Sequence, residues 1–110
     1  MSDAIEKIQS AIRGSKITLF MKGTRSFPMC GFSAATVQIL EQLGAQFQTV
    51  DILQDPEVRE AIKRYSNWPT IPQLYIDGKF VGGADIVREL YETGELEPMV
   101  KAAASASAHK

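Results

Sequence analysis

The chain has 110 residues, enough for one small domain, and 45% of them are hydrophobic, so it can bury an ordinary core. A net charge of −1 and a pI near 5.8 predict no general attraction to nucleic acid or to a membrane surface. No apolar run approaches the length of a membrane span. One cysteine excludes an intrachain disulfide framework, and no targeting segment is visible at the N-terminus, so a reducing, cytoplasmic location is expected.

The first half of the chain predicts a helix and then a βαβ unit. Apolar residues at helical spacing follow Asp3, the expected N-cap, and Gly14 ends this helix. Residues 16–21 alternate little in polarity, which predicts a strand buried on both faces. A loop, a second helix and a second strand are expected over residues 23–29, 31–43 and 47–52. Such a βαβ unit implies that its two strands are parallel.

The second half predicts a helix, a hairpin and further helices. Asp55-Pro56-Glu57 combines an N-cap, a proline at N1 and an acidic first turn, so it starts a helix that ends before residues 68–72. Two short apolar runs joined at Asp77-Gly78 predict a β-hairpin. Gly82-Gly83 lead into another helix. A short last helix is expected over residues 96–100.

These elements predict one α/β domain over residues 1–101. Its sheet is mixed and four-stranded, built from the βαβ unit and a ββα unit, with helices on both faces. Residues 102–110 are of low complexity and lack large apolar side chains, so they are expected to be a disordered tail.

Cys30 is expected where the loop over residues 23–29 meets the second helix. Unpaired N–H groups and the positive end of the helix dipole favour a thiolate there. The alternative is a small buried apolar residue, which is the usual environment of a free cysteine. Pro28 and Gly31 are turn residues and favour an exposed position instead. We therefore expect Cys30 to be reactive or metal-ligating, with Lys22 and Arg25 as neighbouring cations.

Four motifs in this order resemble the monothiol glutaredoxins of the CGFS type. The resemblance covers roughly residues 3–100, and its motifs are Lys22, Cys30-Gly31-Phe32-Ser33, Trp68-Pro69-Thr70-Ile71-Pro72 and Gly82-Gly83-Ala84-Asp85. The resemblance implies a thioredoxin-like fold, glutathione as a cofactor and a [2Fe-2S] cluster held at the interface of a homodimer. It also implies a role in cluster storage, transfer to acceptor or assembly proteins, and redox homeostasis.

Ser33 occupies the position at which dithiol relatives carry a second cysteine. Ala84 occupies a position at which some CGFS members carry a further one. Whatever thiol chemistry the resemblance implies therefore depends on Cys30 alone.

The resemblance also implies which residues bind glutathione. Lys22, Arg59 and Lys63 would hold its glycyl carboxylate. Arg59 and Lys63 lie one helical turn apart, although this spacing alone equally fits a solvated helix face. Cys30, Gly31 and Phe32 would also contact glutathione, with Cys30 near its thiol. Phe32 is in addition a candidate to shield the cluster, and ordinary core packing is the alternative for it.

Two further segments complete the implied site. Ile71-Pro72 resembles the cis-proline junction of thioredoxin-like folds, where the peptide groups of the preceding residue pair with an extended peptide such as the cysteinyl unit of glutathione. An ordinary trans proline is the alternative. Gly83, Ala84 and Asp85 would receive the γ-glutamyl end at a helix N-terminus, with Asp85 as a plain helix cap otherwise. Trp68 could line the site or belong to the core.

The count of thiols suggests how a cluster would be held. A [2Fe-2S] centre commonly takes four thiolates, and one chain offers only Cys30. Two chains and two glutathiones offer four, so the cluster is expected in a dimer bridged by glutathione.

Two other functions fit the same residues. The first is a glutathione-dependent thiol–disulfide oxidoreductase that uses one cysteine for deglutathionylation. The lack of a second cysteine does not exclude this one-thiol reaction, so enzymatic activity stays open. The loop over residues 23–29 resembles that of the CGFS class, which favours an iron–sulfur carrier over the enzyme. The second is a thioredoxin-like adaptor with an idle thiol, which would bind no ligand.

Overall fold

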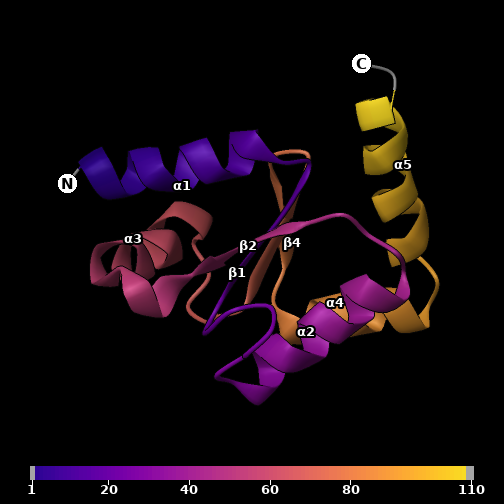
Figure 1. Cartoon of the computed structure of the whole chain (residues 1–110), viewed down its shortest axis with the longest axis horizontal. Coiled ribbons are helices and arrows are strands. Elements are labelled where there is room, and N and C mark those ends of the chain that lie inside the picture. The colour runs from indigo at the N-terminus through magenta and orange to yellow at the C-terminus, as the bar shows by residue number, and fades with distance from the viewer. Residues whose placement is uncertain (1, 109–110) are drawn as a thin grey trace.

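The protein is described here by a computed structural model that covers residues 2–108. In this range four strands form one sheet, and helices lie against both of its faces (Figure 1). The strands are β1 (Ile17–Met21), β2 (Gln48–Asp51), β3 (Gln73–Ile76) and β4 (Lys79–Gly82). The helices are α1 (Ser2–Gly14), α2 (Gly31–Gln42), the 3₁₀ turn η1 (Ile52–Gln54), α3 (Pro56–Ser66), α4 (Ala84–Glu92) and α5 (Leu96–Ala108).

The sheet has the mixed topology expected from the sequence, with strand order β2-β1-β3-β4. β1 runs parallel to β2, with Thr18 opposite Gln48, and antiparallel to β3. β3 and β4 form the predicted hairpin, whose turn residues Asp77 and Gly78 have φ values of 54° and 80°. Positive φ at both central residues is the conformation that an Asp-Gly hairpin turn favours.

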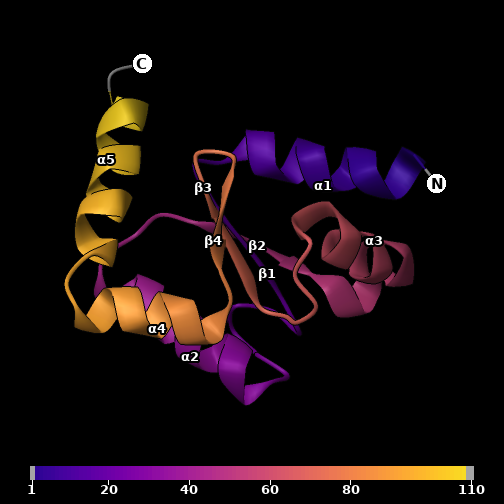
Figure 2. The same ribbon diagram turned by 180° about the vertical axis from the view of Figure 1, so that it is seen from behind.

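Helices α1 and α3 cover one face of the sheet, and α2, α4 and α5 cover the other (Figures 1 and 2). The central strand β1 is buried throughout because its side chains alternate between the two cores. Phe20 packs with Ile8, Ile62 and Tyr75 beneath α1 and α3. Leu19 and Met21 pack on the opposite face, in the core that includes Leu40, Leu74 and Val87.

The two ends of the chain differ from the prediction. α1 begins at Ser2, so Asp3 lies in the first helical turn and is not the N-cap. α5 runs from Leu96 to Ala108, so the last helix is longer than the expected residues 96–100. Alanine has the highest helix propensity, so a run without large apolar side chains can extend a helix that is already packed, and Ala103 is buried in the core. His109 and Lys110 lie outside the described residues.

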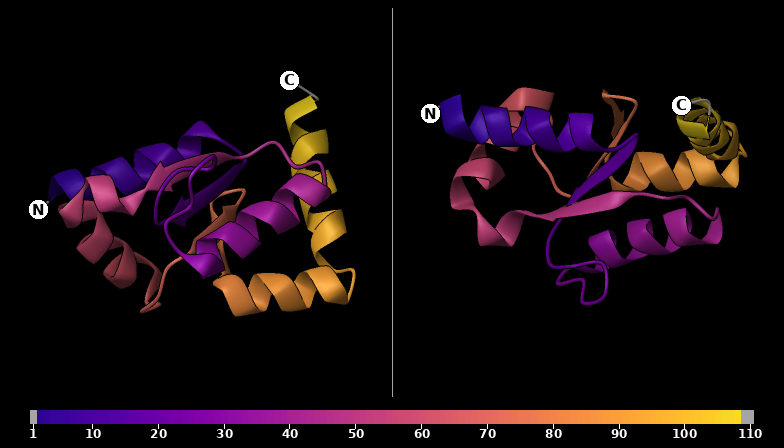
Figure 3. Two further views of the ribbon diagram at one scale, coloured as in Figure 1. Left: turned by 60° about the horizontal axis from the view of Figure 1, so that its bottom comes forward. Right: turned by 45° about the horizontal axis from the view of Figure 1, so that its top comes forward.

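Strand pairing brings the functional segments to one edge of the sheet. β1 and β2 are parallel and end at the same edge; β3 is antiparallel to β1 and begins there, and β4 ends there. The N-termini of α2 and α4 follow two of these strand ends (Figure 3). No helix among residues 2–108 is long and apolar enough to cross a membrane.

Candidate functional site

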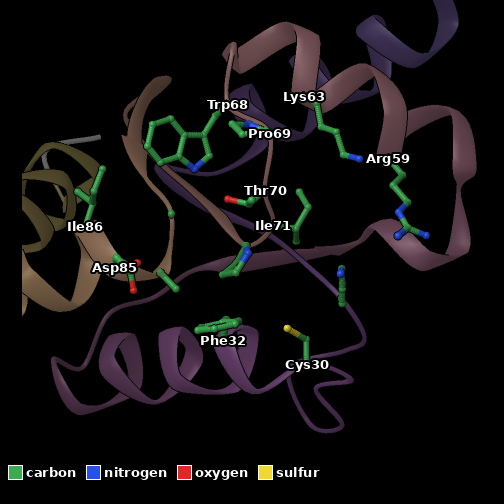
Figure 4. A pocket seen from close by; sticks show the side chains of 14 residues that line it. Cys30, Phe32, Arg59, Lys63, Trp68, Pro69, Thr70, Ile71, Asp85 and Ile86 are labelled. Carbon is green, nitrogen blue, oxygen red and sulfur yellow. The ribbon is translucent and has the colours of Figure 1, made fainter.

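An open pocket of about 480 Å³ lies at this edge of the sheet (Figure 4). Four segments of the chain contribute its walls: the end of β1 with the start of α2, one side of α3, the connection from α3 to β3, and the start of α4. The lining residues are Lys22, Cys30, Phe32, Arg59, Lys63, Trp68, Pro69, Thr70, Ile71, Pro72, Gly83, Ala84, Asp85 and Ile86.

The loop between β1 and α2 is closed by its own backbone. The N–H of Met29 donates to the carbonyl of Lys22 at 2.8 Å, and the N–H of Gly23 donates to Asp51 Oδ1 at 2.9 Å. Gly23 has a φ of 90°, and a Cβ at this position would lie 2.5 Å from the carbonyl oxygen of Phe27. Glycine is therefore required for the turn that delivers Cys30 to the pocket.

Cys30 is the N-cap residue of α2, with an extended backbone, and its thiol is free. The side chain makes no regular capping hydrogen bond. The nearby N–H of Ser33 nevertheless lowers the pKa of the thiol, partial burial opposes this, and the N–H of Phe32 and the charge of Lys22 lower the pKa further. The expected shift towards a thiolate is therefore present, and its main source is the helix backbone.

Ser33 supports this arrangement and is absent from the predicted site residues. Its side chain is fully buried, and its Oγ accepts a hydrogen bond from the N–H of Lys22 at 3.2 Å. The first turn of α2 is thereby tied to the end of β1. The sequence signal that could have identified it is its position three residues after Cys30, in the first turn of the predicted helix.

Arg25 does not lie beside Cys30, which corrects the expectation. Its Nε donates to Glu41 at 3.0 Å, its guanidinium donates to the carbonyl of Phe47 at 3.3 Å, and its Cζ lies 3.9 Å from the centre of the Phe47 ring. These contacts direct the side chain towards the C-terminal part of α2, away from the pocket. The cation near the thiol is Lys22.

Lys22, Arg59 and Lys63 all line the pocket, as the resemblance implied. Arg59 and Lys63 extend from α3 towards the side of the pocket that holds Cys30 (Figure 4). None of the three is paired with a carboxylate among residues 2–108. This side of the pocket therefore presents free positive charge, which suits an anionic group of a ligand.

The connection from α3 to β3 forms another wall of the pocket. The Ile71–Pro72 peptide bond is cis, as expected, and both residues line the pocket. Trp68 also lines it, with its ring centre 5.8 Å from that of Phe80. Its Nε1 is buried without a hydrogen-bond partner among residues 2–108. Thr70 belongs to the same wall and was not predicted, because no charge or turn signal distinguished it.

The N-terminus of α4 forms the last wall, where Gly83 is the N-cap. A Cβ on Gly83 would lie 3.0 Å from Trp68 Nε1 and 3.4 Å from the carbonyl of Pro72, so this close approach favours glycine. Asp85 lies in the first turn and does not cap the helix. Its exposed carboxylate lies 3.7 Å from Arg88. Ile86, which was not predicted, also lines the pocket.

Two residues of the CGFS motif differ in their placement. Phe32 lines the pocket and is 64% exposed, so it does not belong to the core. Gly31 is exposed and does not line the pocket, and outside its own helical turn and chain neighbours no atom lies within 4 Å of the position a Cβ would take. Gly31 therefore follows Cys30 in the first turn of α2 without forming a wall of the pocket.

The described part of one chain offers no group of side chains that could enclose a metal. Among residues 2–108 no three His, Cys, Asp or Glu side chains are grouped so that they could hold a metal ion. Cys30 offers a single thiol at the pocket with its pKa lowered towards the ligating form. These residues fit an iron–sulfur cluster only if the remaining thiolates come from other molecules.

Comparison with known proteins finds relatives of this chain among the glutaredoxins. The glutaredoxin family model matches residues 17–81. An uncharacterized ycf64-like monothiol glutaredoxin of Synechocystis is 54% identical over 97 residues, which cover 88% of this chain and 91% of that protein.

Two solved structures share the fold. The solution structure of reduced poplar apo GrxS14 has a TM-score of 0.82 and 48% identity, covering 92% of this chain and 93% of the other. The crystal structure of a buckwheat glutaredoxin–glutathione complex has a TM-score of 0.84 and 27% identity, covering 94% and 92%. The thioredoxin-like architecture expected from the sequence is thus confirmed. The chain belongs to the glutaredoxin family, and within it to the monothiol glutaredoxins of the CGFS type.

Proposed function

We propose that this chain binds glutathione in the pocket beside Cys30 and carries a [2Fe-2S] cluster between two copies of itself. The cluster is cargo, which the dimer stores and passes to acceptor or assembly proteins. Two Cys30 thiolates and two glutathione thiolates would supply the four ligands that such a cluster commonly takes. The thiolates must stay reduced, so the proposal requires a reducing compartment such as the cytoplasm.

One observation carries the proposal: the single thiol of the chain opens into a pocket whose cations have no carboxylate partner among the described residues, and its pKa is lowered. Glutathione has two carboxylates, an ammonium group and a thiol. Lys22, Arg59 and Lys63 suit the glycyl carboxylate, while the N–H groups at the start of α4 and the carboxylate of Asp85 suit the γ-glutamyl end. A glutathione placed in this way would bring its own thiol close to Cys30.

Native mass spectrometry of protein reconstituted anaerobically with iron, sulfide and glutathione tests the proposal. The expected species is a dimer that holds one cluster and two glutathiones, with the visible absorption of a [2Fe-2S] centre. Removing glutathione should release the cluster and dissociate the dimer together, because ligand, cluster and interface are linked. Cys30→Ser should fold but load no cluster. A loaded monomer, or a dimer that keeps its cluster without glutathione, contradicts the proposal.

A one-cysteine oxidoreductase is the second candidate, and the lowered pKa of Cys30 favours it too. In that reaction the Cys30 thiolate attacks the glutathionyl sulfur of a mixed disulfide and releases the substrate thiolate. A second glutathione thiolate then attacks the Cys30–glutathione disulfide, which yields oxidised glutathione and returns the Cys30 thiolate. Fast turnover of a glutathionylated peptide by protein that takes up no cluster would favour the enzyme over the carrier.

A further inference from the structure

Gln73 is a buried polar residue directly behind the wall formed by residues 68–72. It is the first residue of β3, follows the cis proline, and is fully buried. Its Nε2 donates to the carbonyls of Trp68 and Thr70, at 3.1 Å each. Its Oε1 accepts a hydrogen bond from the hydroxyl of Tyr75 at 3.3 Å. The side-chain amide therefore uses both donors on one short stretch of the pocket wall.

The orientation of this amide follows from its three partners. Burial raises the pKa of Tyr75 to about 12, so the hydroxyl stays protonated and can donate. Turning the amide over would place its oxygen against two carbonyl oxygens, which offer no proton. The NH₂ group must therefore face the loop.

The direction of the Thr70 carbonyl also fixes the direction of the next N–H. The only cis peptide bond among residues 2–108 is Ile71–Pro72, so the Thr70–Ile71 bond is trans. In a planar trans peptide the C=O and N–H groups point in opposite directions. Because the Thr70 carbonyl points inwards to Gln73, the Ile71 N–H points away from Gln73, to the side of the wall on which Thr70 and Ile71 line the pocket.

We propose that Gln73 is a positioning residue for ligand binding, which holds the Thr70 carbonyl inside the protein so that the Ile71 N–H is presented to the pocket. The acceptor is a carbonyl of an extended peptide, and under the proposed function, on which this inference rests, it belongs to glutathione. Gln73 never touches the ligand. It acts by determining which way one peptide group faces.

Glutamine suits this position better than other polar side chains. The site needs two donors for the loop and one acceptor for Tyr75, which a primary amide supplies without charge. Lysine and arginine have no acceptor and would bury a charge, and the asparagine side chain is one methylene shorter.

A matched pair of variants separates positioning from stability. Gln73→Met and Gln48→Met both replace an amide by an apolar side chain of similar length. The Gln48 amide also donates two hydrogen bonds, to the carbonyl of Ala11 and to Thr18, but it lies outside the pocket. In calorimetric titration, Gln73→Met should weaken glutathione binding by about tenfold, equivalent to about 1.4 kcal/mol, whereas Gln48→Met should change it by less than about twofold.

Equal affinities of Gln73→Met and the wild type would overturn the inference and leave the proposed function standing. A wild type that binds no glutathione would overturn both. NMR gives a second readout. In the wild type the resonance of the Ile71 backbone amide should shift on saturation with glutathione. In Gln73→Met that response should be lost while the amides of Ala84 and Asp85 still report a bound ligand.

A measurement on the wild type avoids dependence on the folding of a variant. Hydrogen exchange of the Ile71 amide should be fast in the free protein and slowed by saturating glutathione, because the ligand supplies the acceptor. An Ile71 amide that is already protected in the free protein would be bonded inside the structure, and this would refute the inference.

Discussion

Gly23 is the position at which one added methyl group should displace Cys30. In Gly23→Ala the new Cβ would lie 2.5 Å from the carbonyl oxygen of Phe27 and 2.6 Å from the backbone nitrogen of Met29. Both are backbone atoms of the same closed loop, so neither can move without opening it. The matched control is Gly44→Ala, because Gly44 also has a positive φ, of 70°, but apart from its chain neighbours no atom lies within 4 Å of its Cβ position.

The magnitudes follow from these two environments. A non-glycine residue in the left-handed region costs roughly 1–2 kcal/mol, partly offset by the lower entropy of the unfolded alanine variant, so Gly44→Ala should lose about 1 kcal/mol. Gly23→Ala should suffer the same backbone strain. It should also break the backbone hydrogen bond from Met29 to Lys22 and the two backbone hydrogen bonds between Thr24 and Phe27. At roughly 0.5–1.5 kcal/mol for each hydrogen bond, the total loss should be about 3–5 kcal/mol.

Urea denaturation and the alkylation of Cys30 check this prediction together. The midpoint of unfolding should fall much further for Gly23→Ala than for Gly44→Ala, and only Gly23→Ala should change the alkylation rate, because Met29 directly precedes the thiol. Equal losses of stability in the two variants would show that the contacts of Gly23 are unimportant. An unchanged alkylation rate in Gly23→Ala would show that the loop does not position Cys30.

Three further predictions follow from the charges and the thiol of the site. Arg59→Glu should weaken glutathione binding in calorimetric titration by about tenfold or more. Arg64→Glu, on the same helix but outside the pocket, should change the affinity by less than about twofold. Equal losses would place the glycyl carboxylate of glutathione elsewhere. The alkylation rate of Cys30, measured against pH, should show an inflection at a lower pH than a free cysteine does, because the Ser33 N–H and the Lys22 charge lower the thiol pKa. Lys22→Gln should move this inflection to higher pH. An inflection of the wild type at the value of a free cysteine contradicts the prediction. A thiol pKa lowered by folding stabilises the folded chain above the unfolded pKa, and this stabilisation is lost as pH falls through the folded pKa. The free energy of unfolding of the wild type, relative to that of Cys30→Ser, should therefore increase as pH rises from the folded to the unfolded pKa of Cys30. A difference that does not change with pH contradicts this.

Local turn chemistry explains why much of the site could be predicted from the sequence. Cys30 between Pro28 and Gly31, and Gly83 before the helix that contains Asp85, each carry a signal within a few residues. Hydrophobic periodicity placed the same segments at the ends of strands and helices. Once the pairing of the strands was expected, those ends had to meet at one edge of the sheet, and the structure shows them there.

The residues that were missed depend on contacts between distant parts of the chain or on backbone direction. Arg25 was placed near Cys30 by sequence proximity, but its partners Glu41 and Phe47 are 16 and 22 residues away. Gln73 is next to a recognised motif, yet its role depends on which way the Thr70 carbonyl faces. No composition or periodicity argument gives that direction, because it depends on the complete path of the loop.

Ser33 connects the absence of a second thiol to the geometry of the first. A hydroxyl oxygen is a good acceptor for the N–H of Lys22, whereas a thiol sulfur at this position would accept only weakly. Ser33 leaves Cys30 without an intramolecular partner, and it also holds the start of α2 against the end of β1. This keeps the N–H groups of Phe32 and Ser33 close to the Cys30 sulfur. Any new bond of that stabilised thiolate must be made to another molecule, and the cationic pocket beside it favours one that carries a carboxylate.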